Sequence, residues 1–154
     1  NLSLYFEDRL TIQYQVQEML RIEKIFEPAA IQEELETYNP LIPDGSNLKA
    51  TTMLEFEDVE VRRKRLAELV GMEHQVWLQV SGHEKVFAIA NEDLERSTDE
   101  KTSAVHFMRF ELTDQMIKAL RSGAALSFGS DHLAYLHQVT VAEPTRSALI
   151  LDLD

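Results

Sequence analysis

The stretch from Thr11 to Phe26, TIQYQVQEMLRIEKIF, constrains the fold more than any other part of this chain. At about 100° per residue, its apolar side chains form one broad arc and a second, smaller patch on the opposite side. The arc comprises Ile12, Val16, Met19, Leu20, Ile22 and Phe26, and the patch comprises Tyr14 and Ile25. A helix that is apolar on two sides needs cover on two sides. The pattern therefore predicts a central helix.

Glu23 points into the middle of the main apolar arc, where a lone carboxylate is costly unless a cation meets it. Residues 105–112 read as a strand that is apolar on both faces, so we predict a central strand covered on both sides. His106 and Arg109 are buried with that strand on this interpretation. Arginine can satisfy both carboxylate oxygens and stays charged when buried. We therefore predict an ion pair between Glu23 and Arg109.

The rest of the chain mixes strand and helix patterns. Strands are predicted at residues 2–6, 48–57, 125–128 and 135–141, with a hairpin over 75–90 that turns at Gly82 and His83. Further helices are predicted to begin near Pro28, Asp58, Thr113 and Pro144. Tight hairpins among helices lack the regular alternation of a parallel sheet. The prediction is one α+β domain over residues 1–154, with a largely antiparallel sheet packed against a central helix and several shorter helices.

Composition excludes several classes of function. The chain has 15 basic and 27 acidic residues and a net charge of −12, which disfavours nucleic acid and anionic membranes as partners. The basic run Arg62 to Arg65 is accordingly interpreted as a solvated helix face. Neither a membrane span nor a signal peptide is evident, so we expect a soluble cytoplasmic protein. Cysteine is absent, which excludes disulfides, thiol nucleophiles and Cys-ligated clusters, and no cofactor is predicted.

The best candidate site combines the loop at residues 39–47, NPLIPDGSN, with the polar groups predicted to be buried on the central helix and the central strand. Two prolines and an Asp-Gly step predict a stiff loop. Its backbone donors, with Asn39, Asp44, Asn47 and Lys49 around them, can hold a small polar or anionic ligand. The alternative is a turn fixed for folding alone, by its prolines and by side-chain bonds from Asn39 or Asn47. The polar residues 91–103 are predicted to be the most mobile internal segment.

Two further groups of polar residues have a structural and a functional interpretation. Glu18 and Arg21 lie three residues apart on the predicted central helix, so they either form a local ion pair or line a pocket. Asp131, His132 and His137 can ligate zinc or iron, but their spacing matches no strong motif. His137 shares a strand face with valines, which favours a histidine at the edge of the core. A metal site here is therefore the weaker alternative.

Three segments, LYFEDRLTIQYQVQEMLRIEKIF, ELETYNPLIPDGSNLKAT and EKTSAVHFMRFELT, together with the later GSDHLAY, resemble the bacterial family of unknown function DUF3501. The resemblance covers nearly the whole chain. Members of this family begin further upstream with a basic helical segment, and this chain begins at Asn1 rather than Met, so we expect it to be a piece of a slightly longer protein.

Family members often lie beside genes for rubrerythrin-like and iron–sulfur oxidoreductases. The resemblance therefore implies an accessory role in redox or oxidative-stress metabolism, with a redox protein as partner. It implies no catalytic residues. Leu133 stands where members usually carry proline after the histidine of the last turn, so a shared role of that turn does not carry over to this chain.

Two hypotheses of function follow from the sequence. The first is a non-enzymatic accessory or ligand-binding module, because the chain has no nucleophile motif, no phosphate-binding glycine loop and no paired-histidine motif. The second is a small enzyme that uses Glu23, His106 and Arg109 as buried acid, base and anion holder on a small polar substrate. The sequence favours the first.

Overall fold

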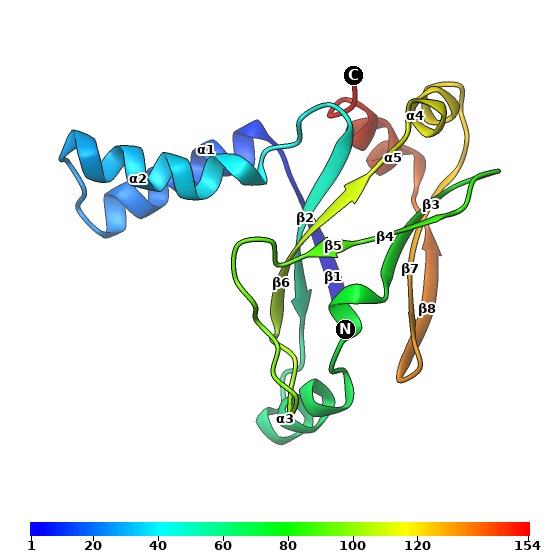
Figure 1. Cartoon of the computed structure of the whole chain (residues 1–154), viewed down its shortest axis with the longest axis horizontal. Coiled ribbons are helices and arrows are strands. Elements are labelled where there is room, and N and C mark those ends of the chain that lie inside the picture. Colours follow the sequence, from blue (N-terminus) through cyan, green and yellow to red (C-terminus); the bar gives the residue numbers. More distant parts are fainter.

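The structure, a computed structural model, describes residues 1–154 and contains two antiparallel sheets with helices at their ends (Figure 1). The helices are α1 (Arg9–Ile22), α2 (Pro28–Tyr38), α3 (Val59–Glu68), α4 (Asp114–Arg121) and α5 (Glu143–Ile150), with short 3-10 helices η1 (Asn39–Leu41) and η2 (Met72–His74). The strands are β1 (Leu2–Glu7), β2 (Asn47–Leu54), β3 (Val76–Val80), β4 (Lys85–Phe87), β5 (Ile89–Ala90), β6 (Val105–Glu111), β7 (Leu126–His132) and β8 (Tyr135–Thr140). The predicted α+β class is confirmed.

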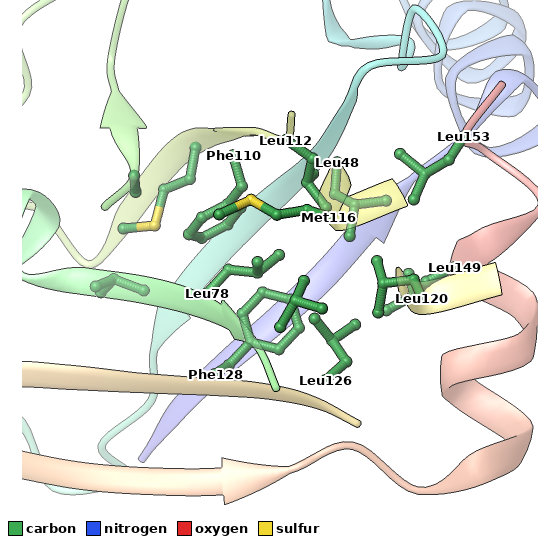
Figure 2. Packing of buried hydrophobic residues seen from close by; sticks show 14 of the residues in the cluster. Leu48, Leu78, Phe110, Leu112, Met116, Leu120, Leu126, Phe128, Leu149 and Leu153 are labelled. Carbon is green, nitrogen blue, oxygen red and sulfur yellow. The ribbon is translucent and has the colours of Figure 1, made fainter. Parts of the chain in front are cut away.

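The two sheets pack face to face. The first sheet has the strand order β1-β2-β6-β5 and the second has the order β4-β3-β7-β8. Figure 2 shows the apolar core between them, in which Leu78, Phe110 and Leu126 are fully buried. The rings of Phe110 and Phe128 meet edge to face across the sheets, 5.5 Å apart. Leu120 of α4 and Leu149 of α5 close one end of this core.

Helix boundaries follow the predicted capping residues. Asp8 accepts a hydrogen bond from the Thr11 amide and caps α1, which begins at Arg9. Asp58 caps α3 and Thr113 caps α4 in the same way. Proline occupies the first turn of both α2 and α5, where its missing N–H is not needed. No helix combines the length and the apolar character that crossing a membrane would require.

The prediction of a central helix is wrong. Helices α1 and α2 form a hairpin, residues 9–38, that extends away from the sheets, and we call it the α1–α2 arm (Figure 1). Only Ile12 and Val16 of α1 are buried, whereas Tyr14 is 62% exposed and Phe26 is 79% exposed. The helix ends at Ile22, before the left-handed residue Lys24, and α2 then covers one side of it. On the second apolar side, Tyr14 is exposed and Ile25 is only partly buried.

The predicted hairpin over 75–90 is confirmed for β3 and β4, but its register and its end are wrong. Residues 81–84 join the two strands, with Gly82 in the left-handed conformation (φ +86°), in place of a two-residue turn. A turn centred between Gly82 and His83 places Leu78 opposite Phe87, but in the structure Leu78 lies opposite Val86. After β4 the chain leaves the second sheet, and Ile89 pairs with Arg109 of the first sheet. Ala88 makes this switch, and its N–H still donates to the Val76 carbonyl, 2.8 Å away.

Strand β6 lies inside the first sheet as predicted, but only one of its faces is buried. His106, Met108 and Phe110 point into the core, as period-two alternation requires. Phe107 and Arg109 point to the outer face, where they are partly exposed. The apolar content of Phe107 suggested a second buried face, but that face lines a pocket instead.

Candidate functional site

A pocket of about 620 Å³ lies on the outer face of the first sheet. Its floor is formed by β2, β5 and β6, and its walls are the end of α2 with η1 on one side and residues 92–96 on the other. Apolar side chains on the floor and walls include Leu41, Ile89 and Phe107. This volume is in the range of sites for small organic molecules. We call it the β2–β6 pocket.

Strand register sets the order of side chains across the floor of the pocket. Glu7 pairs with Lys49, Lys49 pairs with Arg109, and Arg109 pairs with Ile89. Residues that pair directly across antiparallel strands point to the same face of the sheet. Two candidate residues that are 60 positions apart in the sequence, Lys49 and Arg109, are therefore neighbours in one site.

Arg109 is held by two carboxylates, and neither of them belongs to Glu23. Its guanidinium donates to both oxygens of Glu92, at 2.8 and 2.7 Å, and it also forms an ion pair with Glu111. The hydrogen bonds with Glu92 are the largest cause of a raised pKa of Arg109 and of a lowered pKa of Glu92. The predicted pair of Glu23 and Arg109 is wrong. Glu23 caps α1 in the exposed arm, because that helix does not pack against β6.

The second arginine of the pocket is also neutralised. Arg96 donates to both oxygens of Asp93, at 2.7 and 2.6 Å, and its guanidinium lies 4.6 Å above the ring of Phe107. Lys49 differs from both arginines. Its ammonium donates to the Pro40 carbonyl at 2.5 Å and forms no ion pair. Among the cations that line the pocket, Lys49 is the one without a carboxylate partner.

The loop at residues 39–47 is fixed largely by its own side chains, as the structural interpretation predicted. Asn47 is fully buried, and its side-chain oxygen accepts from the Asp44 amide at 3.3 Å, while Asp44 accepts from the Ser46 amide at 3.0 Å. The carbonyl of Gly45 accepts from the amide of Asp154, at 2.8 Å. Asn39 makes no such side-chain bond. The loop contributes Pro40 and Leu41 to the pocket wall, while Asn39, Asp44 and Asn47 do not line it.

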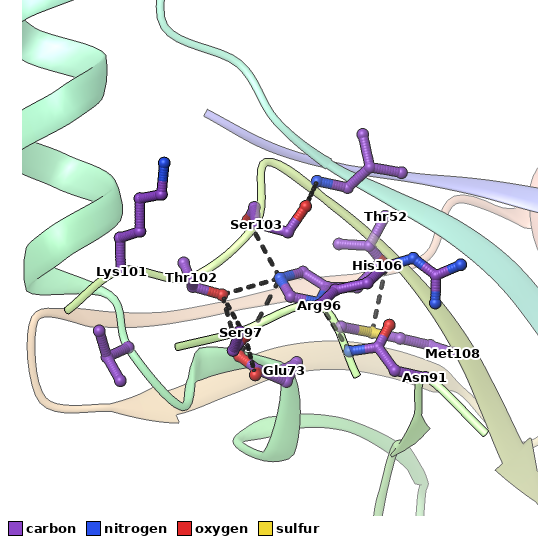
Figure 3. Close-up of polar contacts among 12 residues, drawn as sticks. Thr52, Glu73, Asn91, Arg96, Ser97, Lys101, Thr102, Ser103, His106 and Met108 are labelled. Carbon is purple, nitrogen blue, oxygen red and sulfur yellow. Dashed lines mark hydrogen bonds and ion pairs between the residues drawn. The ribbon is translucent and has the colours of Figure 1, made fainter. Parts of the chain in front are cut away.

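His106 belongs to a buried polar cluster on the opposite face of β6, shown in Figure 3. Its Nδ1 faces the Asn91 side-chain amide at 3.0 Å, and its Nε2 faces the Thr102 hydroxyl at 2.9 Å. The side-chain oxygen of Asn91 accepts from the Phe107 amide, so its NH₂ group must donate to Nδ1. An imidazole that accepts at Nδ1 carries its single proton on Nε2 and is neutral.

Glu73 completes this cluster and was not predicted from the sequence. Its carboxylate accepts hydrogen bonds from Ser97 and from Thr102, the latter at 3.1 Å, and lies 4.0 Å from the ring of His106. Burial raises the pKa of Glu73, but these hydrogen bonds and the nearby imidazole outweigh burial, so its pKa is lowered. Burial also lowers the pKa of His106, which Glu73 only partly offsets.

The depressed pKa of His106 predicts a loss of stability in mild acid. Below the usual histidine value of 6.5, the unfolded chain takes up a proton that the folded protein does not, so stability falls as the pH falls. The slope approaches about 1.4 kcal/mol per pH unit for this one group. His106→Gln should flatten the decline below pH 6.5 in urea unfolding, whereas His137→Gln, at an exposed site, should leave it unchanged. An unaltered slope in His106→Gln would contradict the assignment.

Asp131, His132 and His137 do not form a metal site. Asp131 accepts from the indole of Trp77 at 2.7 Å and pairs with Lys85 at 2.8 Å. The ammonium of Lys85 also lies 4.2 Å from the centre of the Trp77 ring. His132 bonds to the Val70 carbonyl and to the Ala134 amide, and the side chain of His137 is exposed. No group of three or more potential ligands converges anywhere in the chain.

The remaining candidates are distributed along the surface. Glu18 and Arg21 form the predicted local ion pair at 2.7 Å, on the α1–α2 arm and away from the β2–β6 pocket. In the basic run of α3, three of the four cations pair with Glu60 or Glu68 of the same helix, which supports a solvated face. Glu23, His106 and Arg109 occupy an exposed arm, a buried cluster and an outer sheet face, so they cannot act on one substrate.

The fold and the pocket define an α+β protein with a site of the size that small molecules occupy. The chain belongs to the family described as "Protein of unknown function (DUF3501)", whose model matches residues 1–153. It is similar to a protein of unknown function from Burkholderia pseudomallei, known from a crystal structure. The two share 54% sequence identity with a TM-score of 0.92 over 99% of this chain and 80% of that one. A search of curated proteins returned no match.

Proposed function

We propose that this protein is a ligand-binding module and that the β2–β6 pocket takes a small organic anion, a carboxylate with an apolar body. The observation that carries the proposal is the state of Lys49. Its ammonium has three donors and only one protein acceptor in the structure, the Pro40 carbonyl. A ligand carboxylate can accept from the remaining donors.

The other cations of the pocket offer no competing site for an anion. Glu92 and Asp93 occupy the guanidinium groups of Arg109 and Arg96. Glu7 does not pair with Lys49, because its two oxygens accept from the hydroxyls of Thr51 and Thr11, at 2.6 and 2.7 Å. Each of these acidic groups already has partners, so a bound anion would be stabilised most strongly at Lys49.

The apolar part of the ligand would lie on the floor beside Lys49. Phe107 pairs with Thr51, two residues along the strands from the pair of Lys49 and Arg109. Ile89 pairs with Arg109 on the side away from Lys49. Leu41 of η1 faces the pocket from the wall. Apolar walls with a few placed polar groups are the usual composition of small-molecule sites.

A binding experiment with matched probes tests this function. Benzoate should bind in isothermal titration calorimetry, and the uncharged benzamide should bind more weakly. Lys49→Met should reduce benzoate affinity by about tenfold or more, since it removes a charged hydrogen-bond donor. Lys101→Met, which removes an exposed lysine outside the pocket, is the control. Equal binding of benzoate and benzamide, or unchanged affinity in Lys49→Met, would refute the proposal.

We also propose that the module serves a redox protein in the bacterial cytoplasm. The support is the resemblance to a family whose members often lie beside genes for rubrerythrin-like and iron–sulfur oxidoreductases. An affinity pull-down from the native host with the full-length chain tests this part. Recovery of no redox protein would argue against the redox association and would leave the binding site untouched.

A further inference from the structure

Strand β8 ends the second sheet and offers a free backbone edge. The Val141 amide donates to the Leu126 carbonyl of β7, and the register continues with Val139 opposite Phe128. In an antiparallel pair the bonded residues alternate. The N–H and C=O groups of Leu136, Gln138 and Thr140 therefore point away from β7, and no strand of the chain pairs with them.

The other sheet edges are short or obstructed, which makes β8 an exception. Strand β4 has three residues and begins with Lys85, and β5 has two residues. Strand β1 lies against the second sheet, where the Leu2 amide donates to the Tyr135 hydroxyl at 3.2 Å. Natural proteins usually guard an edge with lysine, proline, a bulge or a short strand. Strand β8 has six residues and none of these guards.

Charge also distinguishes this edge. The protein carries a net charge of −12, so two copies repel each other at most approaches. Residues 132–142, HLAYLHQVTVA, form the longest run of the chain without Asp, Glu, Lys or Arg. The same run exposes Leu133 by 91%, Leu136 by 66% and Val139 by 55%. Close contact between identical copies is least opposed along this strand.

We infer that β8 pairs with β8 of a second copy of this chain, antiparallel and about a two-fold axis at Gln138. This register places Gln138 opposite its own counterpart and Leu136 opposite Thr140 of the partner copy. The free N–H and C=O groups of Leu136, Gln138 and Thr140 then all form hydrogen bonds with the partner copy. The second sheet of one copy and the second sheet of the other join into one continuous sheet. Val139 of each copy packs beside His137 of the other.

A two-fold axis at β8 is an isologous contact, which closes after two copies and does not propagate into a fibre. It also leaves the β2–β6 pocket open, because the pocket lies on the outer face of the other sheet. Dimer formation and ligand binding can therefore be measured separately.

The absence of native cysteine permits a direct test of the register. In Gln138→Cys, the two thiols of a dimer face each other at a separation that a disulfide can span. Under mild oxidation at low protein concentration, this variant should form a covalent dimer about tenfold faster than Ser81→Cys, which has its thiol in the exposed β3–β4 turn. Equal rates for the two variants would overturn the proposed pairing.

A second measurement does not depend on introduced thiols. Sedimentation velocity over a concentration series should show the wild-type chain in a monomer–dimer equilibrium. Gln138→Lys should weaken this association by about tenfold or more, because it places two like charges against each other at the axis. The residue is exposed, so the variant should fold, and circular dichroism with thermal unfolding checks this. A wild-type chain that stays monomeric throughout, or an undiminished dimer in Gln138→Lys, would exclude the β8 contact.

Discussion

Glu73→Ala should lower the free energy of unfolding by about 2–4 kcal/mol, because it removes the acceptor at the centre of a buried cluster. The Glu73 side chain is 3% exposed, and both of its oxygens accept hydrogen bonds, from Ser97 and Thr102. Thr102 is itself buried and holds the ring of His106. Truncation leaves a buried hydroxyl without its acceptor and opens a cavity beside it.

Urea unfolding of three variants, Glu73→Ala, Glu73→Gln and Glu68→Ala, separates this effect from a general loss of charge. Glu73→Gln keeps the volume and one acceptor oxygen, so it should cost less than Glu73→Ala. Glu68→Ala removes an exposed carboxylate that pairs only with Lys64 and Arg65 of its own helix, and it should change stability by less than about 1 kcal/mol. If Glu73→Ala were as mild as Glu68→Ala, the buried cluster would not contribute to stability as described.

Gly129→Ala should cost about 3 kcal/mol, because a side chain at this position collides with the indole of Trp77. A Cβ atom would lie 2.3 Å from the Trp77 ring and 2.6 Å from the backbone oxygen of His137. The glycine allows the indole to lie against the strand, where it donates to Asp131 and stacks under Lys85. Displacing the ring breaks both contacts.

Trp77 is the single tryptophan of the chain, so its fluorescence reports directly on this change. Gly129→Ala should shift the native emission to the red, as the buried ring, 2% exposed, moves towards solvent. A double-mutant cycle with Trp77→Leu gives the control, since removing the indole should relieve the clash with the ring and leave only the one with the His137 oxygen. Additive effects in the cycle would show that the cost arises elsewhere, and unchanged emission would argue against displacement of the ring.

Local chemistry made much of the fold predictable. Asp8, Asp58 and Thr113 cap helices because a side-chain oxygen can accept a free amide of the first turn, and this depends on neighbouring residues alone. The α+β class followed from the mixture of hairpins and helices. The place of α1 did not, because apolar periodicity shows that a face needs cover but not what covers it. In the structure, α2 packs against α1, and Tyr14, Ile22 and Phe26 remain exposed.

The candidate site, too, was predictable from the sequence only in part. Lys49 and Arg109 were predicted to belong to one candidate site, but only strand register shows that they are direct neighbours. Glu92 and Arg96 were missed because they lie in a polar segment, residues 91–103, that reads as a mobile loop; its mobility remains a prediction. Glu73 was missed because nothing in its local sequence distinguishes a buried carboxylate from a solvated one.

The strand order has a consequence for synthesis on the ribosome. Strand β2 pairs with β6, and β3 pairs with β7, so each sheet joins segments that are far apart in the sequence. When the first half of the chain has emerged, β2 still lacks its partner β6, and β3 still lacks its partner β7. The apolar faces of β2 and β3 must then wait until β6 and β7 have been translated. Such non-local pairing predicts slow folding and a nascent chain that depends on protection from aggregation until its last third is made.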